Sequence, residues 1–177
     1  MKGWGLLDLG LMISQKSRNY KDLRIGIALP PGIAGIVGNL GVLFSSKIPL
    51  NVNLTVSRES MTARLREAEI DVIISAAKVK KKFPDFPWTD TFLDFGEIIE
   101  TQKSKKISLI FAAIQIICLP KVSCKRFKLD QIQNNRKEAI LLFTSGSSNQ
   151  PKGVVLSDQN ILSNCEQMNS LGLFGDK

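Results

Sequence analysis

Residues 139–156, AILLFTSGSSNQPKGVVL, contain the pattern that decides the fold of this chain. The apolar run AILLF stops at Thr144, small and hydroxylated residues fill positions 144–148, and the apolar run VVL resumes after Gly153. Because both flanks are short apolar runs, the pattern predicts a strand–loop–strand hairpin. Such a loop offers backbone N–H groups, hydroxyls and the cation of Lys152, which is the chemistry needed to wrap a polyphosphate.

The spacing of this loop imitates a Walker loop but does not fit one. Pro151 stands where the second Gly of G-x-x-x-x-G-K-[ST] belongs, and Pro has no N–H to donate to a phosphate. Gly153 stands where the Mg²⁺-binding hydroxyl belongs. A Walker loop also runs directly into a helix, whereas the next helix start here is Ser157-Asp158.

The segment TSGSSNQPKGVV resembles the phosphate loop of the adenylate-forming ligases, the superfamily of acyl-CoA synthetases and AMP-binding enzymes. Asn149 departs from the usual Gly, although Asn tolerates left-handed backbone well. Asp158 replaces the His of many members and adds a negative charge near the loop. The resemblance assigns binding of the cofactor ATP to Thr144, Ser145, Gly146, Ser147, Ser148, Lys152 and Gly153.

Other segments extend the resemblance over about residues 18–174. Residues 24–53 resemble an early strand–helix–strand unit of the family, and residues 57–75 resemble the following helix and strand. EAILLFTSGS and GVVLSDQNILSNCEQM are similar to the acyl–acyl-carrier-protein synthetases, found alone or fused to a lysophospholipid acyltransferase of the 2-acylglycerophosphoethanolamine type. Residues 1–17 are left as an unassigned leader or fusion junction.

The length limits what the resemblance implies. The chain has 177 residues, enough for one domain with a core, whereas a full adenylate-forming ligase is well over twice as long. We therefore expect residues 18–177 to be an incomplete N-terminal part of the large ligase domain. The adenine and Mg²⁺ segment, the ribose-binding Asp and the C-terminal catalytic Lys are missing, so no catalytic residue and no metal ligand is expected.

The activity that the resemblance implies is activation of a fatty acid. ATP and the carboxylate give an acyl-adenylate and pyrophosphate, and the thiol of an acyl carrier protein or of CoA then takes the acyl group. Loop N–H groups, hydroxyls and Lys152 suit the charge that builds on pyrophosphate, with Mg²⁺ on the phosphates. The chain alone is expected to be inactive. The alternative is a non-catalytic nucleotide- or partner-binding module, or a decayed gene product, which the DNA downstream of Lys177 would distinguish.

Charge and composition indicate a cytoplasmic protein with possible contact at the inner membrane face. Lys and Arg number 24 against 16 Asp and Glu, and the excess clusters near residues 78–82, 103–106 and 121–128. Such clusters suit anionic lipid, a phosphorylated substrate or an acidic carrier protein, with solvated loops as the equal alternative. Few aromatic residues and no recognition motif argue against nucleic acid.

The chain has no His, which excludes Ser-His-Asp and Cys-His catalysis and His-ligated zinc within it. Cys118, Cys124 and Cys165 have no C-x-x-C spacing, and their odd number without a signal peptide indicates reduced thiols. All three are expected to be packing residues.

Two apolar segments resemble membrane spans. Residues 25–46 carry no charge, but Pro30-Pro31 and repeated Gly favour a buried strand followed by a helix. Residues 107–120, ISLIFAAIQIICLP, are short for a span and predict either a buried helix or an interfacial helix with basic ends.

The overall pattern predicts an α/β fold, with a layered, largely parallel sheet and flanking helices. Strands are expected at 24–29, 71–75, 139–143 and 153–156, and helices at 32–46, 58–69, 107–118 and 158–168. The helix at 58–69 places Met61, Leu65 and Ala68 on its apolar face and its charged residues, Arg64 among them, outside. Ser157 or Asp158 caps the last helix, whose apolar stripe is Ile161, Leu162, Cys165 and Met168. Pro84 and Pro87 predict a loop over 81–92.

Overall fold

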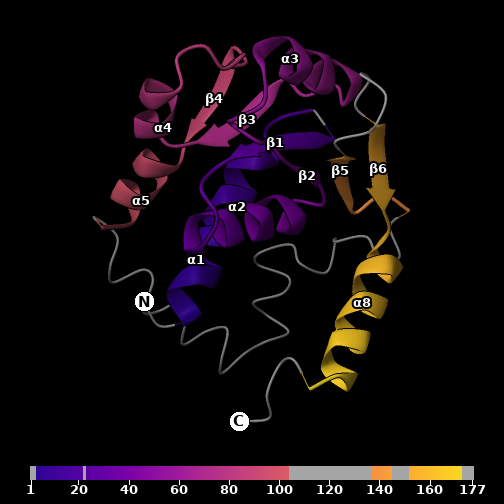
Figure 1. Cartoon of the computed structure of the whole chain (residues 1–177). Helices are drawn as coiled ribbons and strands as arrows, with labels where there is room; N and C mark the ends of the chain where they lie inside the picture. The colour runs from indigo at the N-terminus through magenta and orange to yellow at the C-terminus, as the bar shows by residue number, and fades with distance from the viewer. Residues whose placement is uncertain (1–2, 22, 104–136, 145–151, 173–177) are drawn as a thin grey trace.

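The computed structural model in Figure 1 describes residues 3–21, 23–103, 137–144 and 152–172. The helices are α1 (Gly3–Ser17), α2 (Ile33–Phe44), α3 (Arg58–Glu67), α4 (Ala77–Lys82), α5 (Phe95–Lys103) and α8 (Asp158–Ser170). The strands are β1 (Arg24–Ala28), β2 (Ile48–Asn51), β3 (Val72–Ser75), β4 (Thr91–Asp94), β5 (Ile140–Thr144) and β6 (Lys152–Leu156).

The strands form one six-stranded sheet in the order β4-β3-β1-β2-β5-β6. Neighbouring strands from β4 to β5 run parallel, and only the β5–β6 pair is antiparallel. The register of β5 is set by the pair Leu50↔Leu141. The predicted α/β class, with a largely parallel sheet, is confirmed.

Helices cover the two faces of this sheet and bury a core on each. Ile25 and Ile27 of β1 face a core that includes Ile13 of α1 and Val37 of α2. The opposite core joins Leu50 of β2 and Leu141 of β5 to the apolar face of α3, formed by Met61, Leu65 and Ala68. In Figure 1, α1 and α2 accordingly lie together on one side of the sheet and α3 on the other.

α1 and α2 pack closely because small residues meet between them. A Cβ atom added to Gly41 would lie 2.4 Å from Cβ of Ile13, a distance that no side chain tolerates. Gly10 of α1 lies at the same contact, facing Leu40 and Phe44. Residues 1–17, which the sequence pattern left unassigned, thus contain a helix that packs on α2. Their origin as a leader or fusion junction stays a prediction.

Most of the predicted helices and strands are confirmed. The prediction that needs correction concerns a segment whose local sequence pattern is weak. The predicted helix at 107–118 lies outside the described residues. The prediction of a loop over 81–92 is wrong at its ends, because α4 continues to Lys82 and Thr91 begins β4. β4 pairs with β3 from Val72↔Thr91 to Ser75↔Asp94, so the partner strand stabilises a segment whose own pattern is ambiguous.

α8 follows the hairpin and begins where predicted. Oγ of Ser157 accepts a hydrogen bond from the Asn160 backbone N–H at 3.2 Å, and Oδ1 of Asn160 accepts one from Ser157 N–H at 2.9 Å. The prediction that Cys165 is a packing residue is wrong, since the side chain is exposed, as is Leu162 at 61%. Across the described ranges, no helix has both the length and the apolar character that crossing a bilayer requires.

Candidate functional site

The β5–β6 hairpin places the two ends of the predicted phosphate loop opposite each other. Thr144, the last residue of β5, pairs with Lys152, the first residue of β6, as the last pair in the antiparallel register. The predicted strand–loop–strand arrangement is therefore confirmed. Thr144, Lys152 and Gly153 are placed at the base of the loop, whereas Ser145, Gly146, Ser147 and Ser148 lie outside the described residues.

This hairpin base lies at the edge of the sheet where parallel strands end. β5 runs parallel to β2, so Thr144 and Asn51 end their strands at the same edge. In open α/β sheets, ligands bind in crevices outside the carboxyl ends of the strands. The loop that the sequence singles out therefore leaves the sheet at the edge where open α/β sheets generally bind ligands.

Lys152 and Gly153 lie in different structural environments. Lys152 is exposed at the start of β6. Gly153 pairs with Phe143, and an added Cβ would lie 3.3 Å from Cδ1 of Leu141 and 3.5 Å from Cε1 of Phe143. Close packing against β5 is thus one physical reason for glycine at 153, and its role in cofactor binding stays a prediction.

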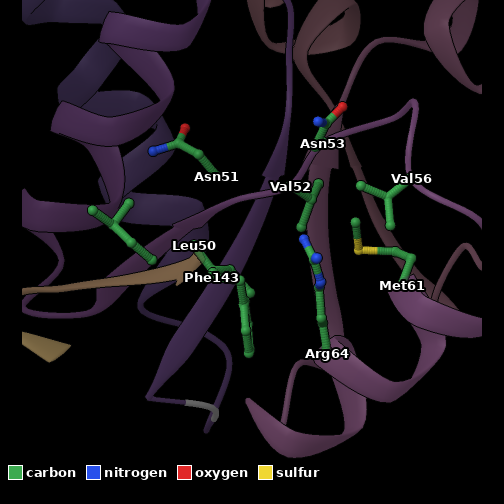
Figure 2. A pocket seen from close by; sticks show the side chains of 9 residues that line it. Leu50, Asn51, Val52, Asn53, Val56, Met61, Arg64 and Phe143 are labelled. Carbon is green, nitrogen blue, oxygen red and sulfur yellow. The ribbon is translucent and has the colours of Figure 1, made fainter. Parts of the chain in front are cut away.

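A cavity of about 320 Å³ opens beside the hairpin base, between the end of β2, helix α3 and the end of β5. Its apolar lining residues come from segments far apart in the chain, namely Leu50, Val52, Val56, Met61, Leu142 and Phe143, and two amides and Arg64 add polar surface. Figure 2 shows the labelled side chains around this cavity, with Arg64 extending from α3 toward the segment that contains Val52.

Both amides at the cavity, Asn51 and Asn53, are engaged by the fold. Nδ2 of Asn51 donates to Oδ1 of Asn39 on α2 at 3.0 Å, and Nδ2 of Asn39 donates back to Oδ1 of Asn51 at the same distance. Oδ1 of Asn53 accepts hydrogen bonds from the backbone N–H and the hydroxyl of Thr55, at 2.9 and 2.8 Å. These bonds hold the chain between β2 and α3 in place and leave Arg64 as the charged group of the cavity wall.

The prediction that Arg64 lies on the outer face of its helix is wrong. The residue is partly buried and lines the cavity, with its guanidinium carbon 5.6 Å from the ring centroid of Phe143. Its Nε is shielded from solvent and has no hydrogen-bond acceptor among the described residues. The sequence spacing could have predicted this partial burial. Arg64 is three residues after Met61 and four before Ala68, so it borders the buried face of the helix.

The start of α3 is fixed locally, which in turn sets the direction of Arg64. Oγ of Ser57 accepts a hydrogen bond from the Ser60 backbone N–H, and Glu59 places a carboxylate in the positive first turn of the helix. Met61 and Leu65 are buried against the sheet. Since these contacts fix the rotation of the helix, Arg64 lines the cavity with its guanidinium near Phe143 of β5.

A family model described as "AMP-binding enzyme" matches residues 15–176. The long-chain-fatty-acid–CoA ligase of Bacillus subtilis is 25% identical over 82% of this chain and 29% of its own length. The 4-hydroxyphenylalkanoate adenylyltransferase of Mycobacterium marinum is 26% identical over 94% of this chain and 25% of its own length. The chain thus spans less than a third of the length of either relative.

Solved structures show the same fold at low identity. A fatty acyl-adenylate ligase from L. pneumophila, in complex with acyl adenylate and pyrophosphate, matches with a TM-score of 0.62 and 18% identity, over 93% of this chain and 26% of that one. O-succinylbenzoate coenzyme A synthetase from Bacillus subtilis, in complex with AMP, matches with a TM-score of 0.64 and 13% identity, over 94% of this chain and 39% of that one. The family match, the α/β sheet and the hairpin agree, and the chain belongs to the AMP-binding enzyme family.

Proposed function

We propose that this chain forms the polyphosphate-binding part of a ligase that activates a fatty acid with ATP. In such a reaction the carboxylate attacks the α-phosphorus, pyrophosphate leaves, and a thiol of acyl carrier protein or CoA then takes the acyl group from the adenylate. The observation that supports the proposal most directly is the pairing of Thr144 with Lys152 at the carboxyl-end edge of the sheet.

The residues at the hairpin base fit a triphosphate in charge and access. Lys152 is exposed at the loop end and supplies a compact ammonium for the β- and γ-phosphates. Its attraction grows as negative charge collects on the departing pyrophosphate, so it favours the transition state over the ground state. The hydroxyls of Thr144, Ser145, Ser147 and Ser148 are proposed to complete the phosphate contacts.

Mg²⁺ is proposed to bind to the phosphates themselves. No group of three or more Cys, Asp or Glu side chains comes together as a metal site in the described part of the chain. Mg²⁺ commonly keeps several waters and binds through substrate phosphates with only one or two carboxylates, so a dedicated protein cage is not required. The cation would screen the phosphate charge that Lys152 does not reach.

The partners proposed are a fatty acid and an acyl carrier protein or CoA. One relative is named as a CoA ligase for long-chain fatty acids and another as an adenylyltransferase. The lysines of α4, Lys78, Lys80, Lys81 and Lys82, are exposed and give this chain a basic surface suited to an acidic carrier protein or the anionic inner face of a membrane.

Calorimetric titration of the full chain with MgATP tests the binding half of the proposal. We expect saturable binding that pyrophosphate competes with and that Lys152→Ala weakens, while Lys78→Ala, at an exposed position of α4, leaves it unchanged. Absence of binding at millimolar MgATP by folded protein would contradict the proposal and favour a partner-binding module.

An ATP–pyrophosphate exchange assay with fatty acid tests the catalytic half. The 177-residue chain is expected to give only background exchange, because the resemblance places the ribose-binding Asp and the catalytic Lys elsewhere in the ligase. Strong, acid-dependent exchange by the pure chain would mean that these described elements suffice for catalysis.

A further inference from the structure

The positive charge of Arg64 is not balanced inside the described structure. No carboxylate of the described residues forms an ion pair with it, although Arg24 has such a partner in Glu138. The Nε–H group of Arg64 is buried without an acceptor there. A ring face at 5.6 Å attracts the cation but accepts hydrogen bonds poorly, so Phe143 alone does not satisfy the guanidinium. Buried polar groups are normally hydrogen-bonded, and an exception calls for a physical explanation.

The cavity next to this charge has the size and lining of a small-ligand site. Its volume of about 320 Å³ lies at the lower end of the range typical of ligand pockets, roughly 300–1,000 Å³. Met61 and Leu50 are buried in its wall, and Phe143 contributes an aromatic surface. Apolar and aromatic side chains with a few polar groups, here Arg64 and two amides, are typical of sites for small organic ligands.

We propose that this cavity binds a small organic anion, with one oxyanion group on the guanidinium of Arg64 and an apolar body against Val56, Met61 and Phe143. One cation in an apolar wall matches one negative charge, whereas a polyphosphate would leave several charges unpaired. The proposed site has none of the residues assigned to the phosphate loop among its described lining residues. It needs neither ATP nor Lys152, so its test is independent of the proposed function.

The guanidinium can approach such a ligand in either of two ways. A carboxylate accepts two parallel hydrogen bonds from the fork of an Arg side chain, either from both terminal nitrogens or from Nε and one of them. Nε is shielded from solvent, so the second mode requires a rotation of the long, unbranched side chain of Arg64. The guanidinium carbon starts 5.6 Å from the ring centroid of Phe143, at the wall of the cavity.

Benzoate is a suitable probe, because it joins one carboxylate to a rigid apolar ring. We would titrate the ¹⁵N-labelled full chain and follow the Nε–Hε signal of Arg64, assigned by its disappearance in Arg64→Lys. We expect a saturable shift of that signal with benzoate. Benzamide, which lacks the charge, and inorganic phosphate, which lacks the apolar body, should each bind more weakly. An unmoved Arg64 signal, or equal affinity for benzoate and benzamide, would overturn the proposal, and tighter binding of phosphate would overturn its organic part.

Three variants distinguish a loss of ligand binding from a loss of folding. Arg64→Gln should lower the affinity for benzoate roughly ten- to hundredfold, as expected for loss of a charged hydrogen-bond partner. Arg66→Gln is the matched control, since it removes the same charge from an exposed position of the same helix and should change affinity by no more than about twofold. Where Arg64→Gln fails to fold, Val56→Phe, at another lining position, should fill the cavity and abolish binding. Undiminished binding in folded Val56→Phe protein, or equal losses in Arg64→Gln and Arg66→Gln, would contradict the proposed site.

Discussion

Arg24 and Glu138 form a two-pronged ion pair across 114 residues of chain. Nε of Arg24 donates to Oε1 of Glu138 at 2.6 Å, and a terminal nitrogen of Arg24 donates to Oε2 at 2.9 Å. The other terminal nitrogen of Arg24 donates to the carbonyl of Ala68, at the end of α3, at 3.3 Å. One side chain thus joins the start of β1, the end of α3 and the approach to β5. It holds the amino end of the strand whose carboxyl end leads into the predicted phosphate loop.

Removing either partner should destabilise the fold. Arg24→Gln and Glu138→Gln are each expected to lower the free energy of unfolding by about 1–2 kcal/mol, because the pair is charge-assisted yet about a fifth exposed at each end. The double variant should lose less than the sum of the single variants, with a coupling of about 1 kcal/mol in urea unfolding. Lys78→Gln, at an exposed position of α4, serves as the control, and strict additivity would mean that the pair contributes nothing.

The pH dependence of this effect follows from the direction of the Arg24 pKa shift. Hydrogen bonding to Glu138 raises the pKa of Arg24 above its ordinary value, outweighing the opposing effect of burial. A cation with a raised pKa stabilises the fold fully below its unfolded-state pKa and loses that contribution only as pH rises through the folded value. The loss caused by Arg24→Gln should therefore be equal at about pH 7 and about pH 9. If the loss of stability caused by Arg24→Gln became clearly smaller between these two pH values, the Arg24 cation would be ruled out as the source of the stabilisation.

Gly41→Ala tests whether α1 is an integral part of this fold. The added Cβ would overlap Ile13, so α1 must shift, and we expect a loss of about 1–3 kcal/mol in the free energy of unfolding. Gly38→Ala on the same helix is the control, because its Cβ would lie 3.1 Å from the flexible end of Leu29, which can move. If Gly41→Ala were as stable as Gly38→Ala, the close packing of α1 on α2 would be wrong.

Under the proposed function, Lys152→Ala should slow adenylation in a complete enzyme built from this sequence. Removing one preorganised charge contact typically costs about 2.7–4 kcal/mol in the transition state, a loss of about a hundred- to a thousandfold in rate. Lys152→Arg should recover part of it, because a planar fork does not reproduce a compact ammonium. Thiol attack on preformed acyl-adenylate should be nearly unaffected, since pyrophosphate has already left. Equal losses in both half-reactions would instead indicate that Lys152 supports the fold of the hairpin.

Binding to anionic vesicles should be weak and sensitive to salt. Each Lys near such a surface contributes about 1 kcal/mol, and the basic sequence around residues 103–128 supplies several. Co-sedimentation of the full chain with phosphatidylserine vesicles should be measurable at low ionic strength and lost at high ionic strength. Neutral phosphatidylcholine vesicles serve as the control. Binding to anionic vesicles that does not change with salt concentration would exclude an electrostatic mechanism.

Strong local patterns made much of the fold predictable. The apolar runs on either side of residues 144–153 were sufficient to predict the β5–β6 hairpin, and the spacing of Met61, Leu65 and Ala68 predicted the buried face of α3. Short elements such as β4 were missed where the local signal was weak. The strand β2, IPLN, contains Pro49 and was implied only by the resemblance of residues 24–53 to a strand–helix–strand unit. Pairing with β1 on one side and β5 on the other stabilises it.

The sequence by itself therefore determined the α/β class, the hairpin and the family resemblance, because these depend on the order and periodicity of neighbouring residues. Only the tertiary structure decided that Arg64 lines a cavity with Phe143, that Arg24 pairs with Glu138 and that Cys165 is exposed. A charged residue at the border of a helical face can point to water or inward, and local pattern does not distinguish the two. The choice depends on what the sheet brings next to it, and parallel pairing brings together strands that are far apart in the sequence.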